Sequence, residues 1–161
     1  MHPLFLAPSS TENIHVKTGL PILLVEDNPD DVFLFTRALS KARRPHPLHV
    51  VSSGREAIDY LSGAGKYSDR NAFPLPDLIM LDLKMPIVSG FDVLKWIRTD
   101  GMARLIPVIV LSSSALTEDV NHAYSLGANA YMVKPADAGA LERLIQTISD
   151  FWHAGEKPDL R

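Results

Sequence analysis

Acidic side chains are crowded where one apolar segment of the sequence ends. The stretch LLVEDNPDD, residues 23–31, passes directly from aliphatic residues to Glu26, Asp27, Asp30 and Asp31. The Asn-Pro pair between these acids is typical of a helix N-cap and a first helical position, so the later two acids would lie where the helix dipole favours anions. Asp30 and Asp31 are therefore predicted to be mostly structural. Glu26 and Asp27 precede the helix and are candidates for chemistry.

Three more polar residues end apolar segments later in the chain. Asp82 follows LIML, Ser112 follows VIVL, and Lys134 follows YMV. Each alone has an ordinary explanation, as a turn former, a helix cap or a surface lysine. Their joint occurrence with Glu26 and Asp27 at strand ends is harder to explain in that way. Because ligands bind at the carboxyl ends of parallel strands, we expect these side chains to converge.

This set of residue types indicates a site for phosphoryl chemistry. Neighbouring carboxylates raise one another's pKa unless a cation lies between them. Oxygen ligands without imidazole or thiolate select a hard ion, so Glu26, Asp27 and Asp82 favour Mg²⁺. Asp82 would be the nucleophile, because aspartate can accept a phosphoryl group as an acyl phosphate. The metal and Lys134 would neutralise charge on the transferring group.

The elements that would position these residues alternate along the chain. Apolar runs predict strands at 21–26, 49–52, 77–82, 106–112 and 130–134, and helical periodicity predicts helices at 29–42, 54–61, 91–100, 117–127 and 140–152. This order predicts an α/β fold with a parallel sheet wound on both faces. Residues 62–76, rich in Gly, Ser and Pro, are interpreted as a long surface loop.

Composition excludes several other classes of function. The 161-residue chain is 46% hydrophobic and 22% charged, as expected of a single soluble globular domain. It has no cysteine, which excludes thiolate sites, and its net charge of −3 gives no reason to expect nucleic-acid binding. No apolar run approaches the ~20 residues of a membrane span, and no secretory signal is recognisable. We therefore expect a cytoplasmic location.

The chain is divided here into an N-terminal arm (1–19), one domain (20–152) and a short polar C-terminal tail (153–161). The arm lacks clear periodicity. We expect no second domain and no DNA-reading element after Trp152, so any output would pass through protein contacts.

In the acids, the serine and the lysine at its predicted strand ends, the sequence resembles a response-regulator receiver domain of two-component signalling. The resemblance covers about residues 20–152 and rests on ED, LDLKMP, S and KP in this order. It implies a flavodoxin-like, doubly wound sheet with strand order 2-1-3-4-5. It also implies a single-domain response regulator that takes a phosphoryl group from the phosphohistidine of a sensor histidine kinase and then switches a protein-interaction surface. Such a protein assists its own phosphorylation and dephosphorylation.

The resemblance assigns a role to each matching acid. Asp82 is the expected phosphoacceptor. Glu26, Asp27, Asp82 and the main-chain carbonyl of Lys84 are the expected Mg²⁺ ligands. Lys84 is also a departure, since Asn is frequent at this position in similar regulators, and its ammonium could reach the phosphoryl group or the acid cluster. The lifetime of the phosphorylated form is therefore in question.

The later motif positions match the switching elements of the family. Ser112 corresponds to the switch hydroxyl, where Thr is commoner, and Tyr131 to the switch aromatic. Lys134 corresponds to the family's invariant lysine, before an expected cis Pro135. The EDNPDD opening, the long loop before PDLIMLDLKMP and the FW ending are similar to single-domain regulators that partner phytochrome histidine kinases.

Two alternatives remain open at this point. A phosphohydrolase of the haloacid-dehalogenase type also uses Asp, then Ser or Thr, then Lys, but it carries a second Asp two residues after the nucleophile, where this chain has Lys84. A receiver-like binding module that is never phosphorylated is the other alternative, although the complete acceptor site argues against it.

The end of the last predicted helix suggests a homodimer. Phe151 and Trp152 follow a core stripe that is already complete, and helix neighbours diverge by ~100°, so both rings cannot face the same core. Exposed aromatics are enriched at interfaces. The alternative is that the N-terminal arm, with Phe5 and Leu6, covers these rings within one chain.

Overall fold

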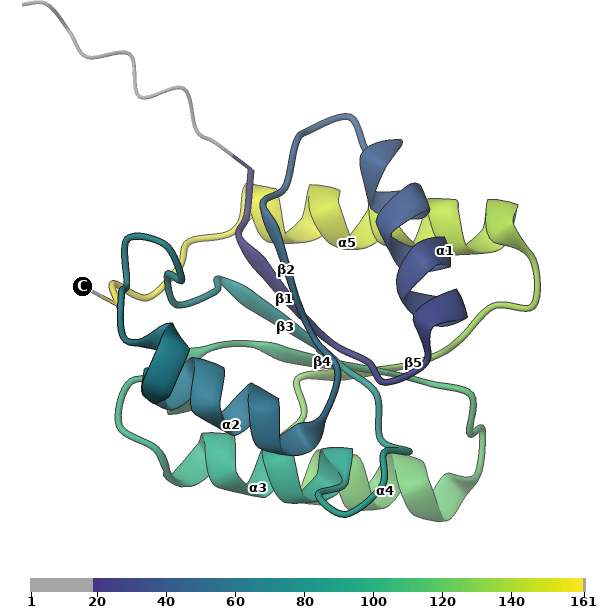
Figure 1. The fold of residues 1–161 in the computed structure, drawn as a ribbon. Helices are drawn as coiled ribbons and strands as arrows, with labels where there is room; N and C mark the ends of the chain where they lie inside the picture. The colour runs from purple at the N-terminus through teal and green to yellow at the C-terminus, as the bar shows by residue number, and fades with distance from the viewer. Residues whose placement is uncertain (1–18, 161) are drawn as a thin grey trace, which may run out of the picture.

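The computed structural model describes residues 19–160, and a five-stranded parallel sheet forms the centre of this part of the chain (Figure 1). The strands are β1 (Ile22–Val25), β2 (Leu48–Val51), β3 (Leu78–Leu81), β4 (Val108–Ser112) and β5 (Ala130–Val133). Their order is β2-β1-β3-β4-β5, and each neighbouring pair is parallel. The predicted flavodoxin-like α/β fold is confirmed.

Helices cover both faces of the sheet. They are α1 (Pro29–Ser40), α2 (Gly54–Ser62), α3 (Gly90–Thr99), α4 (Thr117–Ser125) and α5 (Ala138–Ala154), with short 3₁₀ turns η1 (Gly65–Tyr67) and η2 (Ala103–Leu105). The helices α1 and α5 lie on one face, whereas α2, α3 and α4 lie on the other (Figure 1). None of the helices within residues 19–160 has the length and apolar character needed to span a membrane.

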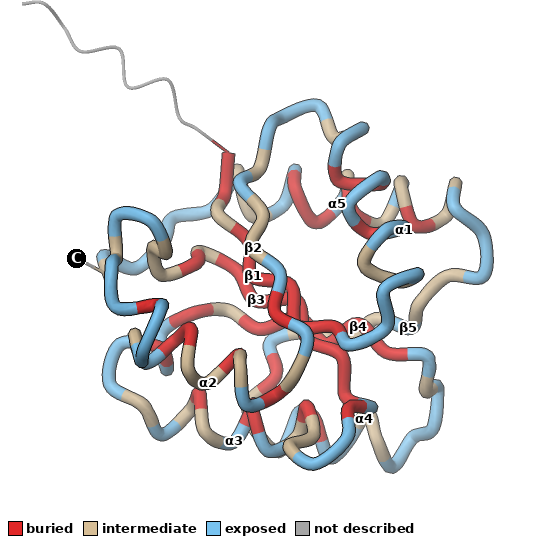
Figure 2. Tube along the Cα trace, in the orientation of Figure 1, coloured by how far each residue is buried: buried red, intermediate tan, exposed pale blue. Residues whose placement is uncertain are grey.

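The central strands bury both of their faces, which explains their unbroken apolar sequences. Every residue of β1, β3 and β4 is buried, and these strands form the red centre of Figure 2. Side chains alternate between faces, so Leu23 and Val25 join the core under α2 and α3, whereas Ile22 and Leu24 join the core under α1 and α5. The edge strands β2 and β5 are less buried, as their polar residues indicate.

The segment 62–76 is packed onto the domain rather than being a simple surface loop. Tyr67 is buried, its ring centroid lies 5.0 Å from that of Phe73, and its hydroxyl donates a hydrogen bond to the Glu56 carboxylate. Burial alone would raise the pKa of Glu56, but hydrogen bonds from Tyr67, a backbone N–H and Lys66 together lower it to about 2. The loop is therefore held by a specific charged contact that its composition did not indicate.

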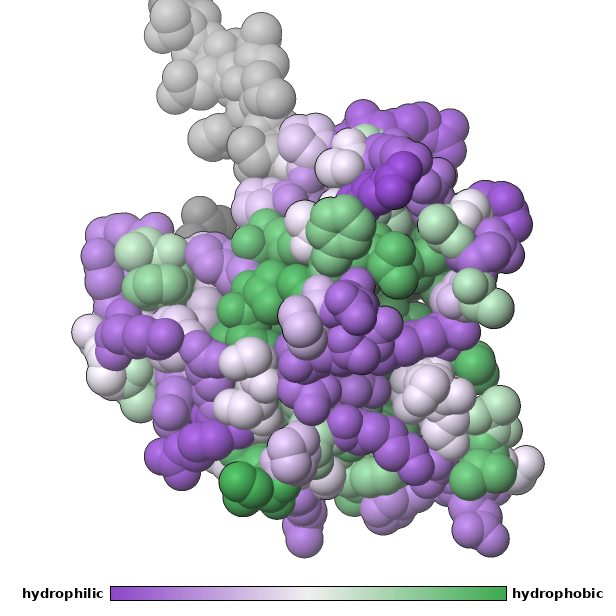
Figure 3. Space-filling view, turned by 45° about the vertical axis from the view of Figure 1, so that its right-hand side comes forward, coloured by the Kyte–Doolittle hydropathy of each residue, from purple (hydrophilic) through white to green (hydrophobic). Residues whose placement is uncertain are grey.

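The boundaries of the flanks differ slightly from those predicted. Helix α5 continues to Ala154, and the following residues pack back, with Lys157 Nζ 3.3 Å from Asp77 Oδ2 and Leu160 against the core. The expected N-terminal arm, including Phe5 and Leu6, lies outside the described residues apart from position 19. On the face shown in Figure 3, apolar side chains gather in the upper middle of the view, and hydrophilic side chains surround them.

Candidate functional site

The carboxyl ends of β1 and β3 bring three acids together. Glu26 and Asp82 are only 3% and 5% exposed, whereas Asp27 is exposed. One carboxylate oxygen from each of the three lies within 4.8 Å of the others. All three donors are hard oxygen ligands, so their number, charge and spacing fit a small divalent cation such as Mg²⁺.

Lys134, which follows β5, contacts this acid cluster. Its Nζ lies 2.8 Å from Glu26 Oε2, 2.8 Å from Asp31 Oδ2 and 3.7 Å from Asp82 Oδ1. The Lys134 backbone N–H donates to the carbonyl of Ser112 at 2.8 Å, which continues the pairing of β5 with β4. Strand pairing therefore aims the lysine side chain at the acids.

Asp31 belongs to this cluster, contrary to the prediction that it is mostly structural. It lies in the first turn of α1, as expected, but its carboxylate accepts a hydrogen bond from Lys134. The sequence signal was its spacing from Glu26, because the first turn of α1 directly follows the end of β1. Asp30 has no such contact with Lys134 among the described residues; its backbone N–H bonds the Asn28 side chain, which caps the helix.

Glu26, Asp31 and Asp82 share one ammonium here, and Asp27 lies beside them, so negative charge exceeds positive charge at this site. Burial raises the pKa of Glu26, and its hydrogen bond from Lys134 offsets this only in part. Burial also raises the pKa of Asp82, with the Lys134 charge opposing and the Asp27 charge adding to the effect. For Lys134, burial lowers the pKa, but its bonds to Asp31 and Glu26 outweigh burial and raise it. An added cation would relieve this imbalance.

The turn after β3 is shaped to hold Asp82. A Cβ on Gly90 would lie 2.1 Å from the Asp82 carbonyl oxygen, so only glycine lets α3 start this close. Ser89 and Asp92 form a reciprocal capping box at the start of α3. Between them and Asp82, Ile87 has a left-handed φ of 67° and is fully exposed. This backbone is uncommon for a β-branched residue and marks a constrained loop beside the acids.

The two expected switch residues meet at Ser114 rather than at Asp82. Ser112 is completely buried at the end of β4, and its Oγ accepts a hydrogen bond from the Ser114 N–H at 3.2 Å. The half-buried Tyr131 donates its hydroxyl to the Ser114 carbonyl oxygen at 2.8 Å. The two side chains are thus connected through the loop that joins β4 to α4.

The structure also gives the position of the Lys84 side chain and the form of the peptide bond before Pro135. The Lys84 ammonium lies 3.6 Å from Asp119 Oδ2 on α4, and within the described residues it makes no ion pair with the acid cluster. The peptide bond before Pro135 is trans, as is every described peptide bond, so the expected cis bond is wrong. The trans form of such a bond is the more stable by about 0.5–1 kcal/mol.

Comparisons with known proteins agree with this geometry. The family model described as the response regulator receiver domain matches residues 22–146. Response regulator Rcp1 of Synechocystis sp. is 35% identical over 131 residues, which cover 81% of this chain and 87% of that protein. The family match favours a receiver over a phosphohydrolase of the haloacid-dehalogenase type.

Solved structures give the same result. The phosphorylated cyanobacterial phytochrome response regulator RcpA superposes with a TM-score of 0.81 at 37% identity, over 88% of this chain and 99% of that one. A response regulator in red light signalling of R. palustris superposes with a TM-score of 0.81 at 34% sequence identity, over 87% of this chain and 99% of that one. The Mn²⁺-bound form of Rcp1 superposes with a TM-score of 0.77 at 33% sequence identity, over 87% of this chain and 99% of that one. The chain therefore belongs to the response regulator receiver domain family.

Proposed function

We propose that this protein is a single-domain response regulator in which Asp82 accepts a phosphoryl group from the phosphohistidine of a sensor histidine kinase. The observation that carries the proposal is the sharing of one half-buried ammonium, that of Lys134, among Glu26, Asp31 and Asp82 at the carboxyl edge of the sheet. Asp82 is the buried aspartate of this set, and it stands at the end of the central strand β3.

The transfer step uses groups that the chain itself provides. A carboxylate oxygen of Asp82 attacks phosphorus, the P–N bond to the kinase histidine breaks, and the imidazole leaves with the electron pair and takes up a proton. The Lys134 ammonium neutralises negative charge on the phosphoryl oxygens during transfer. The same groups assist hydrolysis of the acyl phosphate, in which water attacks phosphorus, the P–O bond to Asp82 breaks, and the carboxylate is regenerated as inorganic phosphate and a proton are released.

The residues that would hold Mg²⁺ are Glu26, Asp27, Asp82 and, through its main-chain carbonyl, Lys84. When bound, the ion supplies Lewis-acid stabilisation of the phosphoryl oxygens. Support comes from the oxygen-only donor set and from the Mn²⁺-bound form of the relative Rcp1.

Phosphorylation would switch the face made by α4 and β5. New phosphoryl oxygens would attract the Ser112 hydroxyl away from the Ser114 N–H, and the loop that also holds Tyr131 would move with it. Amide exchange should therefore change most in α4 and β5. A change confined to α1 and α2 would contradict this assignment.

Labelling with acetyl phosphate and Mg²⁺ tests the phosphoacceptor directly. Wild-type protein should gain one base-labile phosphoryl group, which Asp82→Asn abolishes. Asp27→Ala or removal of Mg²⁺ should suppress labelling. Asp77→Asn is the matched control, because Asp77 lies at the opposite end of the same strand, beside Lys157. Equal labelling of Asp82→Asn would refute the central assignment.

We also propose that the kinase is a phytochrome histidine kinase and that transfer takes place in the cytoplasm. The proposal rests on the similarity to RcpA, a cyanobacterial phytochrome response regulator, and to the red-light regulator of R. palustris. Light-dependent transfer from a phytochrome kinase encoded beside this protein would test it, and transfer only from kinases of other classes would contradict it.

A homodimer through the end of α5 is the remaining proposal. Phe151 is 69% exposed, whereas Trp152 packs against the core under α1 and α5. A second copy would cover the Phe151 ring. Light scattering at micromolar concentration should give about twice the 17.8 kDa chain mass, and Phe151→Ala should lower it. A monomeric wild type would exclude the dimer.

A further inference from the structure

Ser114, in the loop between β4 and α4, is bonded through three of its groups. Its N–H donates to Ser112 Oγ at 3.2 Å, and its carbonyl accepts the Tyr131 hydroxyl at 2.8 Å. Its own hydroxyl donates to Asp119 Oδ2 at 2.5 Å. The same Asp119 oxygen lies 3.6 Å from Lys84 Nζ. Asp119 thus connects the loop after the phosphoacceptor to the loop that follows the switch residue Ser112.

The carboxylate of Asp119 suits this connecting role. Its side chain is 20% exposed, on the first turn of α4. The hydrogen bond from Ser114, together with the charge of Lys84, lowers the pKa of Asp119, so the carboxylate is charged at neutral pH. Both of its partners are within two residues of groups that the phosphoryl chemistry uses, namely Asp82 and Ser112.

We propose that Asp119 is a positioning residue that latches the unphosphorylated form by holding Ser114 and Lys84. We call Lys84, Ser114 and Asp119 the latch. The inference rests on the proposed phosphorylation of Asp82. It goes further by assigning to Asp119 control over how readily the site enters the form that accepts the phosphoryl group.

The reason is that the latch contacts favour one of two states. In the phosphorylated form, phosphoryl oxygens compete with Asp119 for the Lys84 ammonium and with the Ser114 N–H for the Ser112 hydroxyl. Contacts that exist in one state alone stabilise that state, and their removal shifts the population toward the other. Labelling by a small phosphodonor should speed up in proportion to the competent fraction.

Three variants separate the two arms of the latch. Asp119→Asn removes the charge that holds Lys84 but keeps an oxygen for Ser114. Ser114→Ala removes the hydrogen bond to Asp119, together with the 3.3 Å bond that Ser114 Oγ accepts from the Leu116 N–H, but keeps the charge. Asp119→Ala removes both. A hydrogen bond to a charged group is stronger than an exposed ion pair, so we expect roughly twofold faster labelling for Asp119→Asn, about fivefold for Ser114→Ala and about tenfold for Asp119→Ala.

Glu118→Gln is the matched control. Glu118 is exposed and lies on the same first turn of α4, so its change removes the same charge from the same helix end without touching the latch. Its labelling rate should equal that of the wild type. A rate increase for Glu118→Gln as large as that for Asp119→Ala would overturn the latch in favour of a general charge effect.

The experiment measures the initial labelling rate with acetyl phosphate at fixed Mg²⁺, together with amide exchange of unphosphorylated protein. Exchange in residues 113–120 should rise in Asp119→Ala, while the rest of the domain keeps wild-type protection, which excludes unfolding as the cause. Labelling of Asp119→Ala at or below the wild-type rate would overturn the latch. Failure of the wild type to label at Asp82 would instead refute the proposed function itself.

Discussion

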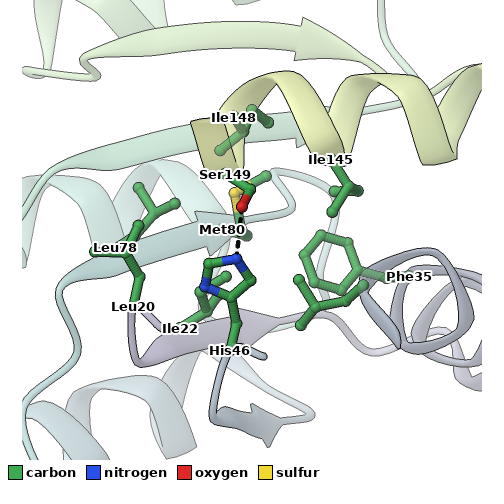
Figure 4. A pocket seen from close by; sticks show the side chains of 10 residues that line it. Leu20, Ile22, Phe35, His46, Leu78, Met80, Ile145, Ile148 and Ser149 are labelled. Carbon is green, nitrogen blue, oxygen red and sulfur yellow. Dashed lines mark hydrogen bonds between the residues drawn. The ribbon is translucent and has the colours of Figure 1, made fainter. Parts of the chain in front are cut away.

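Two clusters of polar side chains lie at opposite ends of the sheet, and they are stabilised in different ways. At the carboxyl ends of the strands, Glu26, Asp82 and Lys134 are charged and share ion pairs. Near the start of β1, His46 and Ser149 form a single hydrogen bond of 2.6 Å between Nε2 and Oγ, in an otherwise apolar pocket (Figure 4).

The two clusters differ in how they affect the free energy of folding. The pocket around His46 has a cavity of about 10 Å³ and mainly aliphatic or aromatic walls, and it holds one neutral hydrogen bond, while His46 Nδ1 is buried without a hydrogen-bond partner among the described residues. The carboxylate cluster has more negative than positive charge, and burial raises the pKa of both Glu26 and Asp82. A charged cluster that is unfavourable by itself is typical of a functional site, whereas the neutral pair is typical of a structural contact.

The largest effect expected from this comparison is on stability without metal. Lys134→Met would leave Glu26 and Asp82 buried without their shared cation, which typically costs about 3–5 kcal/mol of unfolding free energy. Lys41→Met is the matched control, because its pair with Glu142 is exposed and is worth about 0–1 kcal/mol. Urea denaturation in EDTA measures both. Equal losses in the two variants would mean that the carboxylate cluster does not depend on its lysine.

The comparison also shows which parts of the molecule the sequence could predict. The convergence of acids and lysine was predictable because each residue stands at the end of an apolar strand, and parallel strands end at one edge. The contacts of Asp31, Asp119 and Tyr67 could not be predicted from the sequence, because they depend on the direction in which a helix or loop side chain points. The His46–Ser149 bond joins residues that are 103 positions apart, and no local pattern encodes it.

A smaller effect of opposite sign is expected for the phosphoacceptor itself. The folded-state pKa of Asp82 is raised by burial, so its ionised form at pH 7 lowers stability relative to the unfolded chain. Asp82→Asn should therefore raise the free energy of unfolding in EDTA by about 1 kcal/mol, or the Tm by about 2–4 °C. Asp77→Asn, at the half-buried start of the strand, should leave the Tm within about 1 °C. An unchanged or lower Tm for Asp82→Asn would mean that Lys134 fully offsets the burial of this carboxylate.

The smallest effect expected is a pH dependence from the neutral cluster. Burial lowers the pKa of His46 below its ordinary value of 6.5, and the nearby positive charges of His153, Lys157 and Arg44 act in the same direction. The unfolded chain therefore binds the proton more tightly than the folded one. The stability contributed by neutral His46 is fully present above about pH 7 and is lost as the pH falls through 6.5, with a slope of at most about 1.4 kcal/mol per pH unit.

Carboxylates with raised pKa values titrate over an overlapping range with the opposite sign, so the difference between two proteins is the quantity to measure. The unfolding free energy of wild type should fall more between pH 7.5 and 5.5 than that of His46→Gln, which keeps a polar group for Ser149 but cannot gain the proton. His122→Gln is the matched control, because that imidazole lies on exposed helix α4 against Phe91. If His46→Gln loses as much unfolding free energy as wild type over this range, the neutral state of His46 contributes nothing to the stability of the fold. The His46–Ser149 pair would then not be the stabilising structural contact with which the carboxylate cluster is compared.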